Sequence, residues 1–129
     1  MSLTYRPQTA LDTIRRIEAG VNPWIAYRDF LEDWTYMPDA RRGLAEEEPS
    51  VSNPIHLPWA ALLAATVEAL AERDGLSPPQ WVSRSEYRLA EPWYLYKGTG
   101  RMRAWLREST PKSFAVRNIW SGDRLLRRT

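Results

Sequence analysis

The sequence predicts a mostly α-helical protein, a compact bundle of six or seven short helices with one long proline-rich loop. Two observations support this fold class. Apolar residues recur at three- and four-residue intervals in several segments, which is the period of an amphipathic helix. A polar residue followed by proline, as at Asn22 and Thr110, recurs along the chain and is typical of a helix start. The 129 residues suit a single helical domain over residues 1–129.

Two helices are expected near the start of the chain, over residues 9–19 and from residue 22 to about residue 34. Thr9 and Asp12 have the spacing of a capping box, in which each side chain bonds to the backbone of the other residue. Gly20 stands where a left-handed C-terminal cap belongs. Asn22 and Pro23 then restart the chain as an N-cap and first helical residue, so the two helices should meet at a tight corner.

The middle of the chain combines a proline-rich stretch with the clearest helix. Residues 37–57 contain repeated prolines and an acidic run at 46–48, so a short helix over 41–48 is expected within an otherwise irregular segment. Apolar residues then share a broad face over residues 58–74. Gly75 and Leu76 predict a Schellman stop, in which Leu76 packs back on the last turn.

Four further helical elements and one β-segment are expected in the second half. They are a short helix started by Ser77 and containing Trp81, a β-segment at 93–96, a helix over 99–108 capped by Thr99, a helix over 110–117 anchored on Phe114, and a last turn capped by Ser121 that carries Leu125 and Leu126. In the helix over 99–108, Met102, Trp105 and Leu106 are expected to face inward.

No catalytic residue, metal site or cofactor is predicted. His56 is the only histidine and cysteine is absent, so the usual zinc ligand sets cannot be assembled. Neither a Walker loop nor a G-x-G-x-x-G motif occurs. The carboxylates at 29–33 and 46–48 are interpreted as solvated charges, because acid–base chemistry needs two carboxylates in contrasting environments. A small enzyme of unknown class is the third alternative.

Charge is distributed unevenly along the chain. Residues 97–129 hold nine Lys and Arg against Glu108 and Asp123, a balance of +7, which leaves −5 for residues 1–96. The basic third could bind an anionic partner or pair with the acidic part of the chain. The helix–Gly–helix corner at 11–34 has the layout of a DNA-reading motif, but Arg16 and the acidic second helix favour a structural hairpin.

Aromatic residues provide the leading functional hypothesis, a non-enzymatic protein that binds a protein partner. Seven tryptophans are more than a core of this size can hide completely, and aromatic and arginine side chains dominate binding hot spots. The predicted partner-binding residues are Trp93, Tyr94, Tyr96, Arg117, Trp120 and Arg124. The alternative is nucleic-acid binding through the basic third, by Arg101, Arg103, Arg107, Lys112, Arg127 and Arg128.

Three stretches, read together, resemble a loosely defined group of small uncharacterised bacterial helical proteins. They are Ala19-Gly20-Val21-Asn22-Pro23 leading into Ala26-Tyr27-Arg28-Asp29-Phe30-Leu31, then Glu91-Pro92-Trp93, then Thr110-Pro111-Lys112-Ser113-Phe114-Ala115-Val116-Arg117-Asn118-Ile119. Such proteins accompany nucleotidyltransferase-type proteins, and the resemblance therefore implies the antitoxin or regulatory half of a toxin–antitoxin-like pair. Its motifs are structural, so it implies no active-site residue.

A cytoplasmic location without membrane contact is expected. Residues 1–13 have no apolar stretch of the kind that signal peptides contain. The longest apolar stretch, 58–67, is alanine-rich and too short to cross a bilayer. The oligomeric state is left open by the sequence.

Overall fold

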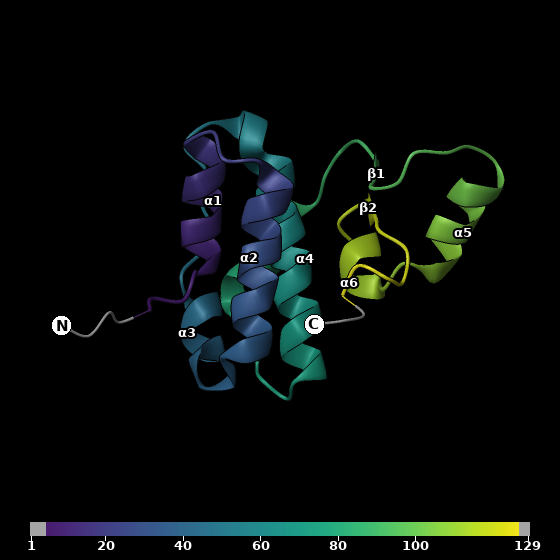
Figure 1. Ribbon diagram of the computed structural model, residues 1–129. Coiled ribbons are helices and arrows are strands. Elements are labelled where there is room, and N and C mark those ends of the chain that lie inside the picture. Colours follow the sequence, from purple (N-terminus) through teal and green to yellow (C-terminus); the bar gives the residue numbers. More distant parts are fainter. Residues whose placement is uncertain (1–4, 127–129) are drawn as a thin grey trace.

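The predicted fold class is confirmed. The computed structural model describes residues 5–126, and it is 59% helical with six α-helices and one tiny two-stranded sheet in that part of the chain. Helices α1 to α4 form a bundle on one side, and the segment that contains β1, α5, α6 and β2 lies against it on the other (Figure 1).

The α-helices and strands have the following bounds. They are α1 Ala10–Glu18, α2 Pro23–Tyr36, α3 Arg41–Glu46, α4 Leu57–Arg73, β1 Trp93–Tyr94, α5 Arg101–Ser109, α6 Lys112–Ala115 and β2 Ile119–Trp120. Four 3-10 turns at Pro38–Ala40, Pro54–His56, Gln80–Ser83 and Ser85–Tyr87 complete the described secondary structure. The proline-rich stretch thus contains the expected short helix, and two of the 3-10 turns flank that helix.

The first two helices begin and end as predicted. The Thr9 hydroxyl accepts the Asp12 backbone N–H at 2.9 Å, and the Asp12 carboxylate accepts the Thr9 N–H at 3.1 Å. Gly20 has a φ of +100°, which suits glycine at the end of a helix. The Asn22 side chain then caps α2 by accepting the N–H of Trp24 at 2.9 Å. Local chemistry therefore determines the corner between α1 and α2.

Helix α4 is the centre of the bundle. Its buried residues lie on almost every side, and its alanines allow the neighbouring helices to approach closely. It ends in the predicted Schellman motif, with Gly75 at a φ of +75° and the Leu76 N–H donating to the Ala71 carbonyl at 2.8 Å. The stretch Pro54–Arg73 is long and apolar enough to cross a membrane by length and composition alone, but 56% of the tested window is buried, as in a core helix.

Four predicted helix starts are wrong, and in one of them the N-cap of α6 is Pro111 rather than Thr110. Pro79 is extended, with a ψ of 152°, so Ser77 starts no helix and residues 80–83 form a 3-10 turn instead. Thr99 makes no side-chain cap, because Gly100 with a φ of +52° is the N-cap of α5. Ser121 starts no helical turn, and its hydroxyl donates to the carbonyl of Gly122.

The two strands pair in parallel and bring distant parts of the second half together. Trp93 is opposite Ile119, and Tyr94 is opposite Trp120. The β-segment at 93–96 is confirmed at its first two residues, whereas its partner strand was not predicted. A two-residue strand has no periodicity that a sequence could reveal.

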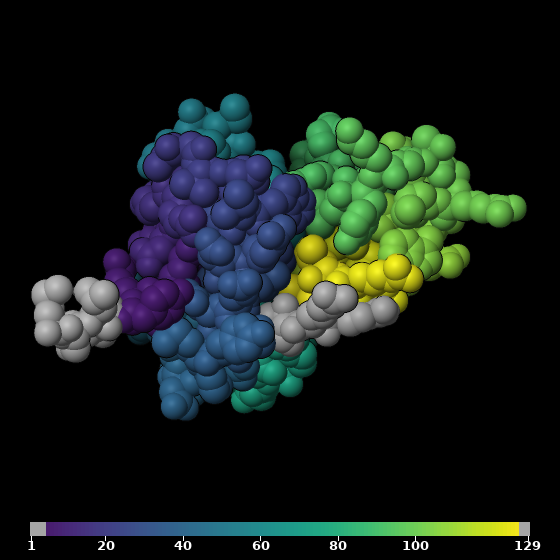
Figure 2. Space-filling view, viewed as in Figure 1, coloured from purple at the N-terminus to yellow at the C-terminus, as the bar shows by residue number. Residues whose placement is uncertain are grey.

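The C-terminal segment shares its interior with the bundle, but α5 does not. Phe114 and Ile119 are buried in the same cluster as the residues of α4. By contrast, α5 buries only Leu106 among its nine residues and lies farthest from the bundle (Figure 1). The space-filling view shows this part of the surface as a projection beside the bundle (Figure 2). Helix α5 is therefore the element most available to a partner.

Candidate interaction surface

Two aromatic rings mark the surface that α5 shares with the small sheet. The strand register places Tyr94 beside Trp120, and their rings are stacked with centroids 6.4 Å apart at an interplanar angle of 26°. Both residues are half-buried. The Trp120 indole N–H donates to the Asn118 side chain at 3.0 Å, which holds the ring in place.

Two arginines on one face of α5 cover these rings. The Arg103 guanidinium lies 4.7 Å from the centre of the Tyr94 ring, and the Arg107 guanidinium lies 4.6 Å from the centre of the Trp120 ring. Arg107 also donates to the Tyr94 hydroxyl at 2.9 Å. We call Tyr94, Arg103, Arg107 and Trp120 the arginine–aromatic cluster. Each cation–π contact at an exposed site contributes about 0.5–1 kcal/mol, so both guanidinium groups are held in position.

A shallow pocket lies on a different side of α5 from this cluster, because a step of two residues turns an α-helix by about 200°. It is lined by Arg101, Met102, Trp105 and Arg124 and has a volume of about 480 Å³. The Arg124 guanidinium lies 5.7 Å from the centre of the Trp105 ring. We call this the α5 pocket. Met102 and Trp105 were expected to face inward, but Met102 is 39% exposed and Trp105 is half-buried, so that prediction holds only for Leu106.

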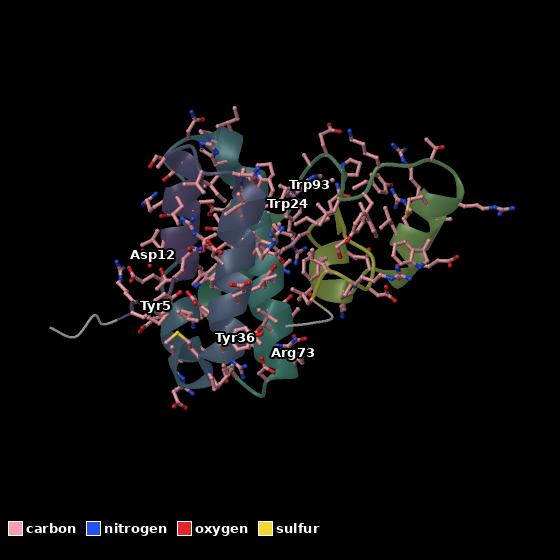
Figure 3. All side chains as sticks on the ribbon, in the orientation of Figure 1. Tyr5, Asp12, Trp24, Tyr36, Arg73 and Trp93 are labelled. Atoms are coloured by element: carbon pink, nitrogen blue, oxygen red, sulfur yellow. The ribbon has the colours of Figure 1, made fainter. Side chains whose placement is uncertain are left out.

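The predicted partner-binding residues fall in different places. Tyr94 and Trp120 belong to the cluster, and Arg124 belongs to the pocket. Trp93 instead packs edge-on against Trp59, with centroids 5.0 Å apart, where the C-terminal segment meets the bundle (Figure 3). Tyr96 is 41% exposed but makes no ring contact with the cluster.

Arg117 is not a surface anchor. Its side chain is 4% exposed, and its guanidinium donates to Glu68 on α4 at 2.9 Å. It also donates to the carbonyls of Ser113 and Val82, each at 2.5 Å. The prediction that Arg117 binds a partner is therefore corrected. Its buried cation instead bridges α4, α6 and the 3-10 turn at Gln80–Ser83.

Half of the predicted nucleic-acid residues lie on α5. Arg103 and Arg107 form the cluster, and Arg101 borders the pocket. Lys112 begins α6 and is exposed. The positions predicted at 127 and 128 lie outside the described residues. Both hypotheses thus place residues on or beside α5.

Pairing with the acidic part of the chain explains one of these charges. Among the described residues, Arg117 forms such a pair with Glu68, whereas Arg101, Arg103 and Arg107 form no ion pair with a carboxylate. The exposed positive charge of α5 is therefore available for a ligand. Because arginine bonds in a planar fork, it suits carboxylate and phosphate groups.

In the described part of the chain, no group of three His, Asp or Glu side chains could hold a metal ion, and no buried side-chain polar atom lacks a hydrogen bond. Burial raises the pKa of Tyr27, whose hydroxyl pairs with Thr66 at 2.7 Å. Burial and the hydrogen bond to Glu48 raise the pKa of Tyr87. Both phenols therefore stay neutral and serve packing.

Fold and surface together define a class, a small helical protein with an arginine–aromatic surface on a projecting helix. No protein-family model matches the chain, and no curated protein and no solved structure matches it significantly. The function is therefore inferred from the geometry of this surface and from the sequence resemblance.

Proposed function

We propose that this protein is a non-enzymatic binding protein that docks an acidic protein partner through α5 and the adjoining sheet. The observation that supports this function is the arginine–aromatic cluster. Its two guanidinium groups are fixed over rings, so binding costs less side-chain entropy than free arginines would lose. Arginine, tyrosine and tryptophan are also the residues that hot spots favour.

A protein partner fits this surface better than a nucleic acid does. Arg103 and Arg107 already cover the faces of Tyr94 and Trp120, so these rings are not free to stack on bases. Exposed Met102 on the same helix adds apolar area to which a protein could bind.

The contact must extend beyond the helix itself. At 1.5 Å per residue, the nine residues of α5 span only about 13 Å. A stable interface buries about 800 Å² on each side. The partner is therefore expected to contact residues outside α5 as well, such as exposed Tyr96 and Arg124.

The sequence resemblance narrows the proposed role. It favours the antitoxin or regulatory half of a bacterial toxin–antitoxin-like pair, in which the partner is a nucleotidyltransferase-type toxin. In that role the protein would inhibit its partner by occupying the surface that α5 contacts, without any chemical step of its own.

Co-purification with a matched control tests this function. The tagged chain is expressed in its source cells as the wild type, as Arg103→Ala with Arg107→Ala, and as Arg42→Ala with Arg88→Ala. The last pair removes the same charge from exposed positions elsewhere. Each sample is split and treated with or without nuclease, and circular dichroism checks the fold of each variant.

The wild type and the control are expected to retain the same acidic protein with and without nuclease. The Arg103 and Arg107 variant should retain at least about tenfold less, since two hot-spot side chains are lost. Equal retention by all three proteins would contradict the proposal. Release by nuclease would favour the nucleic-acid alternative instead.

A further inference from the structure

We infer that the α5 pocket receives an apolar side chain of the protein partner that is flanked by a carboxylate. The inference rests on the proposed function, since the pocket and the arginine–aromatic cluster are both built on α5. It adds the chemistry of the segment that is recognised: an aliphatic residue next to aspartate or glutamate. Three features of the pocket support it.

The floor of the pocket is apolar and accessible. Met102 is 39% exposed, although it lies on a helix with three exposed arginines. Trp105 is half-buried beside it. Covering such side chains is favourable in proportion to the apolar area removed from water, so an aliphatic group gains more here than a polar one.

The backbone also packs closely against the floor residues at two glycines. A Cβ atom at Gly98 would lie 2.7 Å from the Cβ of Met102, and a Cβ at Gly122 would lie 2.8 Å from the Trp105 ring. Gly122 has in addition a φ of +72°, which other residues rarely adopt. The chain therefore approaches both floor residues more closely than any side chain would allow. A pocket formed in this way is ready before the ligand arrives.

The walls of the pocket carry positive charge on two sides. Arg101 is exposed on α5, and Arg124 is exposed and lies over the Trp105 ring. A carboxylate beside the bound aliphatic group could accept two hydrogen bonds from either guanidinium. A phosphodiester chain would match the charge but would present no aliphatic group to the floor. Arg124 also occupies one face of the indole, where a base would otherwise stack.

Labelled peptides test the ligand chemistry with the full chain. Three fluorescein-labelled peptides of about twelve residues are compared by anisotropy: one of leucine with glutamate and aspartate, one of leucine with glutamine and asparagine, and one of glycine with glutamate and aspartate. Single-stranded oligo(dT) is the fourth probe. The acidic leucine peptide is expected to bind at least about tenfold more tightly than each of the others.

Substitutions in the pocket assign that binding to its residues. Arg101→Gln with Arg124→Gln is expected to weaken the acidic leucine peptide about tenfold, whereas Arg42→Gln with Arg88→Gln changes it less than about twofold. Met102→Gln should weaken the acidic leucine peptide and leave the acidic glycine peptide unchanged. This difference between the two peptides would distinguish binding in the pocket from general attraction between charges.

Several results would overturn the inference. These are equal binding of the acidic leucine and acidic glycine peptides, tighter binding of oligo(dT), no effect of the pocket variants, or no binding of the acidic leucine peptide up to about 1 mM. The proposed function has a separate test. If the cellular partner depends on Arg103 and Arg107 but not on Arg101 and Arg124, the function stands and the pocket inference falls.

Discussion

At the scale of single residues, buried Arg117 illustrates how one charge can serve the fold rather than a partner. Its guanidinium has three acceptors, the Glu68 carboxylate and the carbonyls of Ser113 and Val82. These acceptors belong to three separate elements. Removing the cation would leave a partly buried carboxylate and two carbonyls without their donor.

Arg117→Met is therefore expected to lower the free energy of unfolding by about 3 kcal/mol, because breaking a buried pair leaves uncompensated polar groups. Urea denaturation would measure it. Glu68→Gln should cost clearly less, since the two bonds from Arg117 to the carbonyls persist. An unchanged urea midpoint for Arg117→Met would show that the bridge contributes nothing to stability.

The two buried tyrosines predict how stability changes at high pH. The folded pKa values of Tyr27 and Tyr87 lie above the unfolded value of about 10. Above that pH the unfolded chain loses protons that the folded chain keeps, so stability present below pH 10 declines as pH rises. The decline is up to about 1.4 kcal/mol per pH unit for each tyrosine.

Tyr27→Phe and Tyr87→Phe should each make this alkaline decline shallower, whatever they do to stability at neutral pH. Urea unfolding at a series of pH values from neutral to alkaline measures the slope. If both variants follow the wild-type slope above pH 10, the tyrosines are not the groups that titrate.

The sequence could not distinguish Arg117 from the arginines of α5 by residue type. The spacing gave a partial indication that Arg117 is buried, because Arg117 follows Phe114 by three residues and thus lies on the same buried side. Which arginines lie over rings depends on the strand register, which places Tyr94 beside Trp120. That long-range pairing has no local sequence pattern.

At the scale of elements, helix ends with a capping side chain or a terminal glycine were predictable, and helix starts inferred from a polar residue alone were not. Thr9 and Asp12 satisfy each other, whereas Thr99 is replaced as a cap by Gly100. The inward face predicted for α5 was too wide, because Leu106 is its only fully buried side chain in the described structure. A helix that projects needs only a narrow apolar face.

Thr9→Ala should cost about 1 kcal/mol of stability, the usual value of an N-cap hydrogen bond. Thr99→Ala is the matched control and should change stability by less than about 0.5 kcal/mol, because that side chain caps no helix. Thermal or urea unfolding compares the two. Equal losses would contradict the different roles assigned to these threonines.

Gly122→Ala tests how closely the chain approaches α5. The new Cβ would lie 2.8 Å from the Trp105 ring, and residue 122 would have to keep a φ of +72°. The steric clash and the backbone strain therefore both lower stability. Gly75→Ala has a similar φ of +75° but meets nothing within 4 Å, and it should cost about 1–2 kcal/mol from backbone strain alone. Gly122→Ala is expected to cost more in urea unfolding. An equal loss would mean that Trp105 is free to move away.

At the scale of the whole molecule, the boundary between the acidic and the basic part of the chain is close to the boundary between the helical bundle and the segment packed against it. The acidic first part forms the bundle around α4, and the basic last third carries the projecting helix. The charge asymmetry was visible in the sequence. That the predicted aromatic and basic residues meet on one surface required the fold, because residues 94, 103, 107 and 120 come together only through the sheet and α5.

The most direct test is the affinity of the purified chain for the purified partner found by co-purification, measured by calorimetry. Arg103→Ala with Arg107→Ala should weaken binding at least about tenfold, whereas Arg42→Ala with Arg88→Ala should change it less than about twofold. Raising the salt concentration should weaken the wild-type complex by screening its charges. Affinity that is the same for all three proteins and unaffected by salt would contradict the proposal that the arginine–aromatic cluster binds an acidic partner.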